Sequence, residues 1–375
     1  MRLRNDLWAI SIVLLVGCGG DDSEPVSSAG NQGTGNTGGK NPVDLSIWSI
    51  PKNEVFDGGP GKDGIPALEN PAMITANEAT YLAENDLVVG VKMGNDVRAY
   101  PHPILDWHEI INDKVGTTDL AVIYCPLTGT ATAWGRTFNG TTTTFGVSGL
   151  LYNTNVIPYD RATDSHWSQM RLDCVNGLLR EEKAETFHSV ETTWKTWKKM
   201  YPTTKVVSLQ TGFARSYGVY PYGDYKTNNN KILFPYSPVD NRLPNKERVL
   251  GLVAPGSTVL AKAYRFGNFD APISVKHDNF FGLQIVLAGS TTNNFLVAFE
   301  SKTQDGSSLT LSAADFSQGA TASILQDTEG NTWNIFGEAI SGPRTGQKLK
   351  PLTGFIGYWF SWASFYPGIE IGQPQ

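Results

Sequence analysis

Hydrophobic and polar positions in residues 85–202 fall into short runs that predict β-strands separated by turns. Two of these runs, residues 87–91 and 97–100, flank Met93-Gly94-Asn95-Asp96, a turn sequence typical of a β-hairpin. Residues 120–124 form a short continuous apolar run of the kind that a buried strand shows. We therefore expect this part of the chain to fold mainly into antiparallel sheet.

A second hairpin and a closing helix complete the pattern. Residues 130–138 and 141–147 flank Asn139-Gly140, a dipeptide that favours the tight turn of a β-hairpin. In residues 190–201, apolar side chains recur at helical spacing, and the segment stops before Pro202. This pattern predicts a short helix at the end of the sheet-rich unit.

The same features return in the same order about 165 residues later. Trp167 corresponds to Trp333, and Trp194-Lys195-Thr196-Trp197 corresponds to Trp359-Phe360-Ser361-Trp362. A nearly constant offset over ordered landmarks is the signature of an internal repeat. Residues present in both copies are therefore explained by folding, and we expect the shared Trp residues to lie in the core.

The predicted fold class is α+β with predominantly antiparallel β-sheet, built as two tandem degenerate repeats of one sheet-rich unit, each closed by a short helix. The repeats span residues 85–202 and 248–367, and an aromatic-rich connector at 203–247 joins them. The tyrosines around Tyr220-Pro221-Tyr222 in the connector either pack across the junction or line a groove for a ligand.

The N-terminal residues have the pattern of a secretory signal peptide. Arg2 and Arg4 precede the apolar run 7–16, which is too short to cross a bilayer core of about 30 Å as a helix. The run ends in Leu15-Val16-Gly17-Cys18, which resembles the lipobox of bacterial lipoproteins, where the cysteine is lipidated. An ordinary signal peptide with a chance cysteine is the alternative interpretation.

These features predict a lipoprotein signal peptide at residues 1–17, a lipidation site at Cys18 and a flexible tether rich in Gly and Ser at 18–43. The resemblance implies an extracytoplasmic, membrane-anchored lipoprotein of a bacterial outer membrane or cell surface. The membrane would then be a partner through the lipid on Cys18.

Composition excludes several classes of function. With a formal net charge of −6 and no basic cluster, nucleic acid is not expected as a partner. Charged residues make up 18% and aromatic residues 11%, so the chain can bury a core and is not a disordered protein. Three cysteines are too few for a disulfide scaffold or a four-thiolate zinc site.

Chemically reactive side chains are concentrated in the first repeat. It carries His102, His108 and Glu109 before the predicted strand at residues 120–124, and Cys125 directly after that strand. At the matching places the second repeat has Ile273-Ser274-Val275-Lys276-His277 and Ile285-Val286-Leu287-Ala288-Gly289-Ser290 instead. Because residues kept in only one copy are not required by the shared fold, we predict the functional site in the first repeat.

Six ordered motifs run through the first repeat and the end of the connector. They are Trp107-His108-Glu109-Ile110-Ile111-Asn112-Asp113, Tyr124-Cys125-Pro126-Leu127-Thr128-Gly129-Thr130, Phe145-Gly146-Val147-Ser148-Gly149-Leu150, Tyr159-Asp160-Arg161, Trp167-Ser168-Gln169 and Arg242-Leu243-Pro244-Asn245-Lys246-Glu247-Arg248-Val249. Together they resemble the DUF3179 family, a domain of unknown function, over about residues 65–370. Its members commonly carry Cys-Pro-Leu-Cys-Gly and some are named as selenoproteins, which implies thiol or selenol chemistry. In this chain Thr128 replaces the second cysteine of that motif.

Three functions remain open for the predicted site, and with them whether the protein is an enzyme. Cys125, His108 and His102 could ligate copper or zinc, since thiolate and imidazole suit these metals. Alternatively, Cys125 is a redox-active or nucleophilic thiol with His108 as its base. Thr128 would then donate a hydrogen bond to the thiolate, and Glu109 would orient the imidazole. The third function is a non-enzymatic ligand-binding or structural surface lipoprotein.

A few further residues belong to these hypotheses. Arg161 has no counterpart in the second repeat and could bind an anionic ligand. The partner of the whole protein would be a small molecule or a redox protein. Cys174 is interpreted as a buried small hydrophobic residue, while a disulfide with Cys125 stays open in an oxidising compartment. His166 and His188 are expected at the surface.

Overall fold

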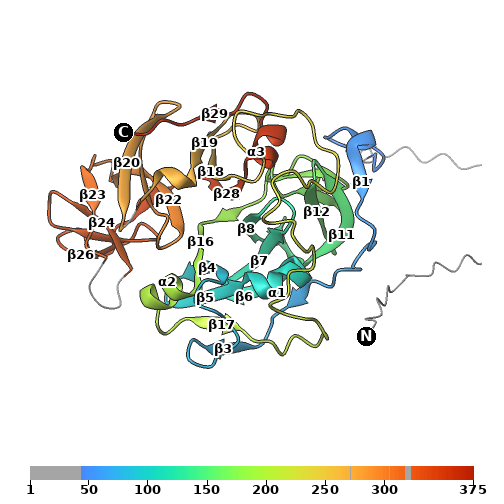
Figure 1. Cartoon of the computed structure of the whole chain (residues 1–375), viewed down its shortest axis with the longest axis horizontal. Helices are drawn as coiled ribbons and strands as arrows, with labels where there is room; N and C mark the ends of the chain where they lie inside the picture. The colour runs from blue at the N-terminus through green and yellow to red at the C-terminus, as the bar shows by residue number, and fades with distance from the viewer. Residues whose placement is uncertain (1–43, 271, 304, 317–321) are drawn as a thin grey trace, which may run out of the picture. The chain divides into compact units, whose positions relative to one another are not determined.

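Strands make up most of the regular structure in the computed structural model, which describes residues 44–270, 272–303, 305–316 and 322–375 (Figure 1). The predicted signal peptide, Cys18 and the tether lie outside the described residues. Within those ranges, no helix is long and apolar enough to cross a membrane. The predicted predominance of antiparallel sheet is confirmed, with helices limited to short segments.

The described part of the first half holds three five-stranded sheets and a two-stranded ribbon. In order across each sheet, the strands are β16 (Ser189–Thr193), β4 (Leu87–Met93), β5 (Asp96–Pro101), β17 (Lys205–Val207) and β3 (Met73–Thr75); β15 (Thr186–Phe187), β8 (Thr130–Gly135), β7 (Thr118–Cys125), β6 (Ile110–Val115) and β2 (Leu68–Glu69); β1 (Val55–Asp57), β11 (Phe145–Tyr152), β12 (Asn155–Asp160), β13 (His166–Ser168) and β14 (Asp173–Asn176); and, in the ribbon, β9 (Thr137–Phe138) and β10 (Thr141–Thr142). Because β1, β2 and β3 precede residue 85, the sheets of this half extend before the predicted start of the first repeat.

The described part of the second half holds three four-stranded sheets. In the same order, their strands are β28 (Gly354–Tyr358), β18 (Arg248–Val253), β19 (Ala261–Arg265) and β29 (Glu370–Ile371); β20 (Ser274–Phe280), β21 (Leu283–Ser290), β22 (Phe295–Thr303) and β27 (Leu349–Pro351); and β23 (Leu311–Ala313), β24 (Ser323–Asp327), β25 (Thr332–Asn334) and β26 (Ala339–Ser341).

Helices in the described ranges are few and short. They are α1 (His102–His108), α2 (Trp194–Met200) and α3 (Trp359–Phe365), with the 3-10 turns η1 (Lys52–Glu54) and η2 (Phe266–Asn268). The helix predicted at residues 190–201 begins only at Trp194, because the residues before it pair with β4 as strand β16. Thr193 caps α2, since its hydroxyl accepts a hydrogen bond from the N–H of Thr196. Helix α1 was not predicted; Pro103 is tolerated in its first turn, where a backbone N–H would have no helical partner.

One sheet in each half has the same strand order. In β16-β4-β5-β17 and in β28-β18-β19-β29, the first three strands pair antiparallel and the last pairs parallel with its neighbour. A Cβ atom at Gly90 of β4 would lie 2.1 Å from Trp197, and one at Gly251 of β18 would lie 2.1 Å from Trp362. Both positions therefore require glycine, because the indole of the closing helix occupies the space of a side chain.

Polar contacts that are buried or partly buried also recur at matching places. They are Tyr100–Asp113 and Trp167–Asp160 in the first half, and Tyr264–Asp278 and Trp333–Asp327 in the second. The two halves differ after β5 and β19, where the first half has helix α1 and the second has only the turn η2. Helix α1 is therefore an addition that the shared strand order does not require.

Hydrophobic cores join the two halves. One buried cluster combines Val88 and Trp197 of the first half with Trp333 of the second. Another combines Ile123 on β7 with Trp362 on α3. The predicted core role of these Trp residues is confirmed, and the halves stabilise each other by removing apolar surface from water.

Candidate functional site

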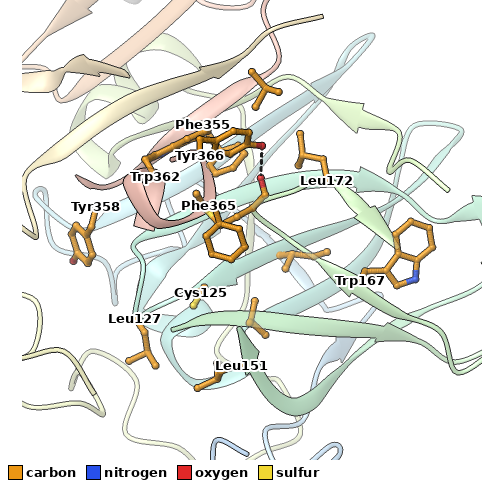
Figure 2. Packing of buried hydrophobic residues seen from close by; sticks show 14 of the residues in the cluster. Cys125, Leu127, Leu151, Trp167, Leu172, Phe355, Tyr358, Trp362, Phe365 and Tyr366 are labelled. Carbon is orange, nitrogen blue, oxygen red and sulfur yellow. Dashed lines mark hydrogen bonds between the residues drawn. The ribbon is translucent and has the colours of Figure 1, made fainter. Parts of the chain in front are cut away.

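The two faces of strand β7 separate residues that the sequence had suggested would act together. Successive side chains of a strand point to opposite faces of its sheet. Ile123 and Cys125 belong to one buried cluster, whereas Val122 and Tyr124 belong to another. Figure 2 shows Cys125 among the apolar side chains of the first cluster, which includes Phe365 of α3. The thiol is therefore directed into a hydrophobic core.

Burial keeps the Cys125 side chain a neutral thiol. It is 1% exposed, and burial raises the pKa of the thiol to about 11. The neighbouring Glu109 acts in the same direction, while Thr128 and the backbone of Val156 lower the pKa only in part. Sγ donates a weak hydrogen bond to the carbonyl of Thr154. Because the thiolate is the nucleophile and the metal ligand, Cys125 is not activated in this conformation.

Cys174 on β14 has the packing role that was predicted. It is fully buried, and burial raises the pKa of its thiol to about 12. It lies opposite Trp167 in the strand register, as Ala339 lies opposite Trp333 in the second half. Cys125 and Cys174 are both free, so the disulfide that the sequence left open is not formed.

His108 is buried and both of its ring nitrogens have other partners. Nδ1 lies 2.7 Å from the carbonyl oxygen of Pro66, and Nε2 lies 2.6 Å from the hydroxyl of Tyr217. Burial lowers the pKa of the imidazole, although the contact with Pro66 opposes this. The predicted pairing of His108 with Cys125 as base and nucleophile is therefore not present in the described structure.

His102 belongs to the other face of β7. Its ring packs against Tyr124, and its Nε2 lies 3.3 Å from a carboxylate oxygen of Glu191 on β16. Among the residues that the structure describes, no three His, Cys, Asp or Glu side chains are grouped as metal ligands. Cys125, His108 and His102 are thus not brought together as the predicted copper or zinc site, because the sheet and the helix direct them to different neighbours.

Glu109 is held in a strained position directly after α1. Its φ of 56° lies in the left-handed region, which is uncommon for residues other than glycine. Its N–H donates to the carbonyl of Leu105, and its own carbonyl accepts from the N–H of Tyr124. The side chain is buried, which raises the pKa of the carboxyl to about 8; a hydrogen bond from Tyr222 opposes the shift and the charge of Asp106 adds to it. Such strain and such a shifted pKa are typical of functional sites.

The Glu109 side chain lines a cavity of about 60 Å³, which we call the Glu109 cavity. The other residues that line it are almost all apolar. They are Gly58, Pro60, Ile65, Leu127, Val147, Gly149, Leu150, Leu151, Val156, Tyr222 and Phe234. A mostly apolar lining with a few placed polar groups is the usual composition of a small-molecule pocket.

A β-bulge forms one wall of the Glu109 cavity. The register between β11 and β12 shifts between Val147 and Leu151. The Ser148 hydroxyl stabilises the bulge by donating to the carbonyl of Ile157 and accepting from the N–H of Leu150. Bulges often occur next to active sites, where they redirect side chains. The Phe145–Leu150 motif thus has a physical role in shaping this wall.

The connector contacts the site through its tyrosines, and Figure 1 shows its irregular path between β17 and β18. The Tyr220 and Tyr225 hydroxyls donate to the carbonyls of Pro126 and Leu127, next to Cys125. The Tyr222 hydroxyl donates to Oε1 of Glu109 over 3.4 Å. The sequence had not paired Tyr222 with Glu109; the run of tyrosines was the signal that could have suggested it.

Two charged residues fasten the connector. Lys226 forms an ion pair with Asp106 of α1, at 3.1 Å to each carboxylate oxygen. Lys246 donates to the carbonyls of Tyr225, Asn228 and Lys231, so it ties the connector into a compact loop. This explains why a lysine stands in the Arg242–Val249 motif.

Thr128 was predicted to donate a hydrogen bond to the Cys125 thiolate, and Arg161 was predicted to bind an anionic ligand. Thr128 is buried next to Cys125, and its hydroxyl forms hydrogen bonds with Thr130 and Asn155. The Arg161 guanidinium lies elsewhere: Nη2 is 2.8 Å from Asp63 and Nη1 is 3.0 Å from Glu69. Arg161 does not line the Glu109 cavity and is committed to these two carboxylates.

The expectation that His166 and His188 lie at the surface is wrong. Both are half-buried, and burial lowers the pKa of His166 and takes that of His188 to about 4. His188 packs against Phe299 and Phe336 of the second half. Its polar sequence neighbours conceal this contact, because it depends on the packing of the two halves.

Comparisons with known proteins give a family without a function. The family model described as "Protein of unknown function (DUF3179)" matches residues 62–369. Neither the search of curated proteins nor that of solved structures found a match. The site therefore has to be interpreted from its own geometry.

Proposed function

The chain belongs to the DUF3179 family, whose function is unknown, and from that premise we propose that the protein binds a small molecule in the Glu109 cavity. The protein would be an extracytoplasmic lipoprotein tethered to a membrane through Cys18. Binding rather than catalysis is the activity that we assign to the first half. This corresponds to the non-enzymatic, ligand-binding alternative derived from the sequence.

The observation that carries the proposal is that the buried residue Glu109 lines an apolar cavity. Desolvating a carboxyl without full hydrogen bonding costs free energy, and among the described residues the Glu109 carboxyl accepts one hydrogen bond, from Tyr222. A strained backbone adds to that cost. Proteins keep such unfavourable groups mainly at functional sites, where a ligand or a reaction requires them. This supports a binding role for Glu109.

A paired thiol and imidazole has less support. The thiol of Cys125 is buried and neutral, and the two ring nitrogens of His108 bond Pro66 and Tyr217. Neither group contacts the other among the described residues. We therefore do not extend the redox or metal hypothesis to a mechanism.

We also propose that residues 85–202 and 248–367 are a tandem duplication, of which one copy kept the site. The matching strand order and the Gly–Trp contacts of Gly90 and Gly251 support this origin. The absence of an α1 counterpart in the described second half supports the assignment of Glu109 to function rather than to folding.

Filling the Glu109 cavity is expected to abolish small-molecule binding without unfolding the protein. Leu151→Trp adds an indole to the cavity wall, and Val147→Met is a smaller change at the same wall in case the first variant folds poorly. Binding of a panel of small fragments is measured by ligand-observed NMR on the full chain. Fragments should bind the unaltered protein and lose binding by at least about tenfold in the filled variants.

The matched control is Leu178→Trp, because Leu178 is 55% exposed and does not line the cavity. This variant should bind fragments like the unaltered protein. The proposal fails if no fragment binds, or if Leu151→Trp and Leu178→Trp bind fragments equally well.

A further inference from the structure

The walls of the Glu109 cavity restrict the chemistry of its ligand. Among the described residues that line it, only Glu109 and Tyr222 have polar side chains. A polar ligand would lose its hydration without gaining partners, which is unfavourable. The main part of the ligand must therefore be apolar, with one polar group placed at the carboxyl.

One oxygen of the Glu109 carboxyl is available to bond a ligand. Tyr222 donates to Oε1, and no hydrogen bond from the described residues reaches Oε2. Burial raises the pKa of this carboxyl to about 8, so at neutral pH it carries a proton. A protonated carboxyl offers one O–H donor, which needs an acceptor from the ligand.

The charged and titratable groups around Glu109 agree with an uncharged ligand. Asp106 on α1 is paired with Lys226 of the connector, Cys125 on β7 is a neutral thiol, and Tyr222 is a neutral phenol. An ammonium group would need several acceptors after losing its water, and the cavity offers the two oxygens of Glu109 with one already bonded to Tyr222.

We infer that the ligand is a small, uncharged, mostly apolar molecule that presents a hydrogen-bond acceptor, such as a ketone or ester carbonyl, to the Glu109 carboxyl. The inference rests on the proposed function, since it names the class of molecule that the same cavity takes. The ligand binds the protonated carboxyl and is released when that proton is lost.

Butan-2-one and butan-2-amine test this inference, because they share a small carbon skeleton and differ in one group. Their binding to the full chain is followed by NMR chemical-shift titration. Butan-2-one should bind, and its affinity should fall about 30-fold between pH 6.5 and 9.5 as Glu109 loses its proton. Butan-2-amine should bind at least about tenfold more weakly than the ketone at pH 6.5.

Two variants isolate the carboxyl. Glu109→Gln keeps an N–H donor, so it should still bind butan-2-one but without the pH dependence. Glu109→Leu removes the donor and should bind the ketone at least about tenfold more weakly. Binding of the amine in place of the ketone would overturn the inferred class while leaving the proposed cavity intact. Binding of neither probe, together with none from the fragment panel, would overturn the proposed function as well.

Discussion

Replacing Glu109 with glutamine is expected to stabilise the protein at neutral pH, with a gain that grows as the pH rises from 4.5 towards 8. The pKa of the folded carboxyl is about 8, whereas the ordinary value of 4.5 applies to the unfolded chain. Between these values the folded state holds a proton that the unfolded state has released. The free energy of unfolding therefore decreases with rising pH, by about 1.4 kcal/mol per pH unit.

Glutamine removes this linkage because it does not titrate, and its amide oxygen can still accept from Tyr222. The expected gain is on the order of 3 kcal/mol at pH 7 and vanishes below pH 4.5. Urea unfolding of both proteins between pH 4 and 9 measures it. Glu182→Gln is the control, since Glu182 is exposed and its removal should change stability by no more than about 0.5 kcal/mol. Parallel pH profiles for the unaltered protein and Glu109→Gln would contradict the raised pKa.

Removing Arg248 is expected to destabilise the protein by about 3–5 kcal/mol, because it leaves a buried carboxylate without its main partner. Arg248 begins β18 in the second half and pairs with Glu191 on β16 in the first, with 2.5 Å between Nη2 and Oε1. Burial acts to raise the pKa of Glu191, but Arg248 and His102 more than offset it, so the pKa lies below its usual range. The pair therefore joins the halves while charged.

Arg248→Met tests this prediction, because methionine has an unbranched side chain without the charge. Chemical denaturation measures the decrease in the free energy of unfolding. Adding Glu191→Gln to Arg248→Met should recover part of the stability, because it removes the uncompensated charge. Arg265→Met is the matched control: Arg265 pairs with Glu247 at a site where its side chain is 42% exposed, and its loss should cost no more than about 1 kcal/mol. Equal losses in Arg248→Met and Arg265→Met would show that the buried pair has no special role.

Local pattern was sufficient to predict the strands and hairpins of the first half. The turn at Gly94 and the apolar strand before Cys125 are determined by residues close in sequence, and the structure contains both as the β4–β5 hairpin and strand β7. The helix at Trp194 was predicted too long, because Val190 and its neighbours pair with β4 instead. Pairing with a strand a hundred residues earlier is a tertiary contact that helical spacing does not record.

Neither helix α1 nor the Glu109 cavity could be predicted from the sequence, for related reasons. Seven residues with prolines before and within the first turn carry too little periodicity to indicate a helix. The partner of Glu109 is Tyr222, more than a hundred residues away on an irregular connector. The sequence did point to the right segment, since Cys125 and Glu109 lie near each other there, but His108 and His102 face other neighbours.

The central claim is that Glu109 is a protonated carboxyl within an apolar cavity at neutral pH, and infrared spectroscopy measures this directly. The difference spectrum between the unaltered protein and Glu109→Gln isolates the carbonyl stretch of this one carboxylic acid. The band should be present at pH 7 and should disappear with a midpoint near pH 8. A band that disappears between pH 4 and 5, as for an exposed glutamate, would contradict it.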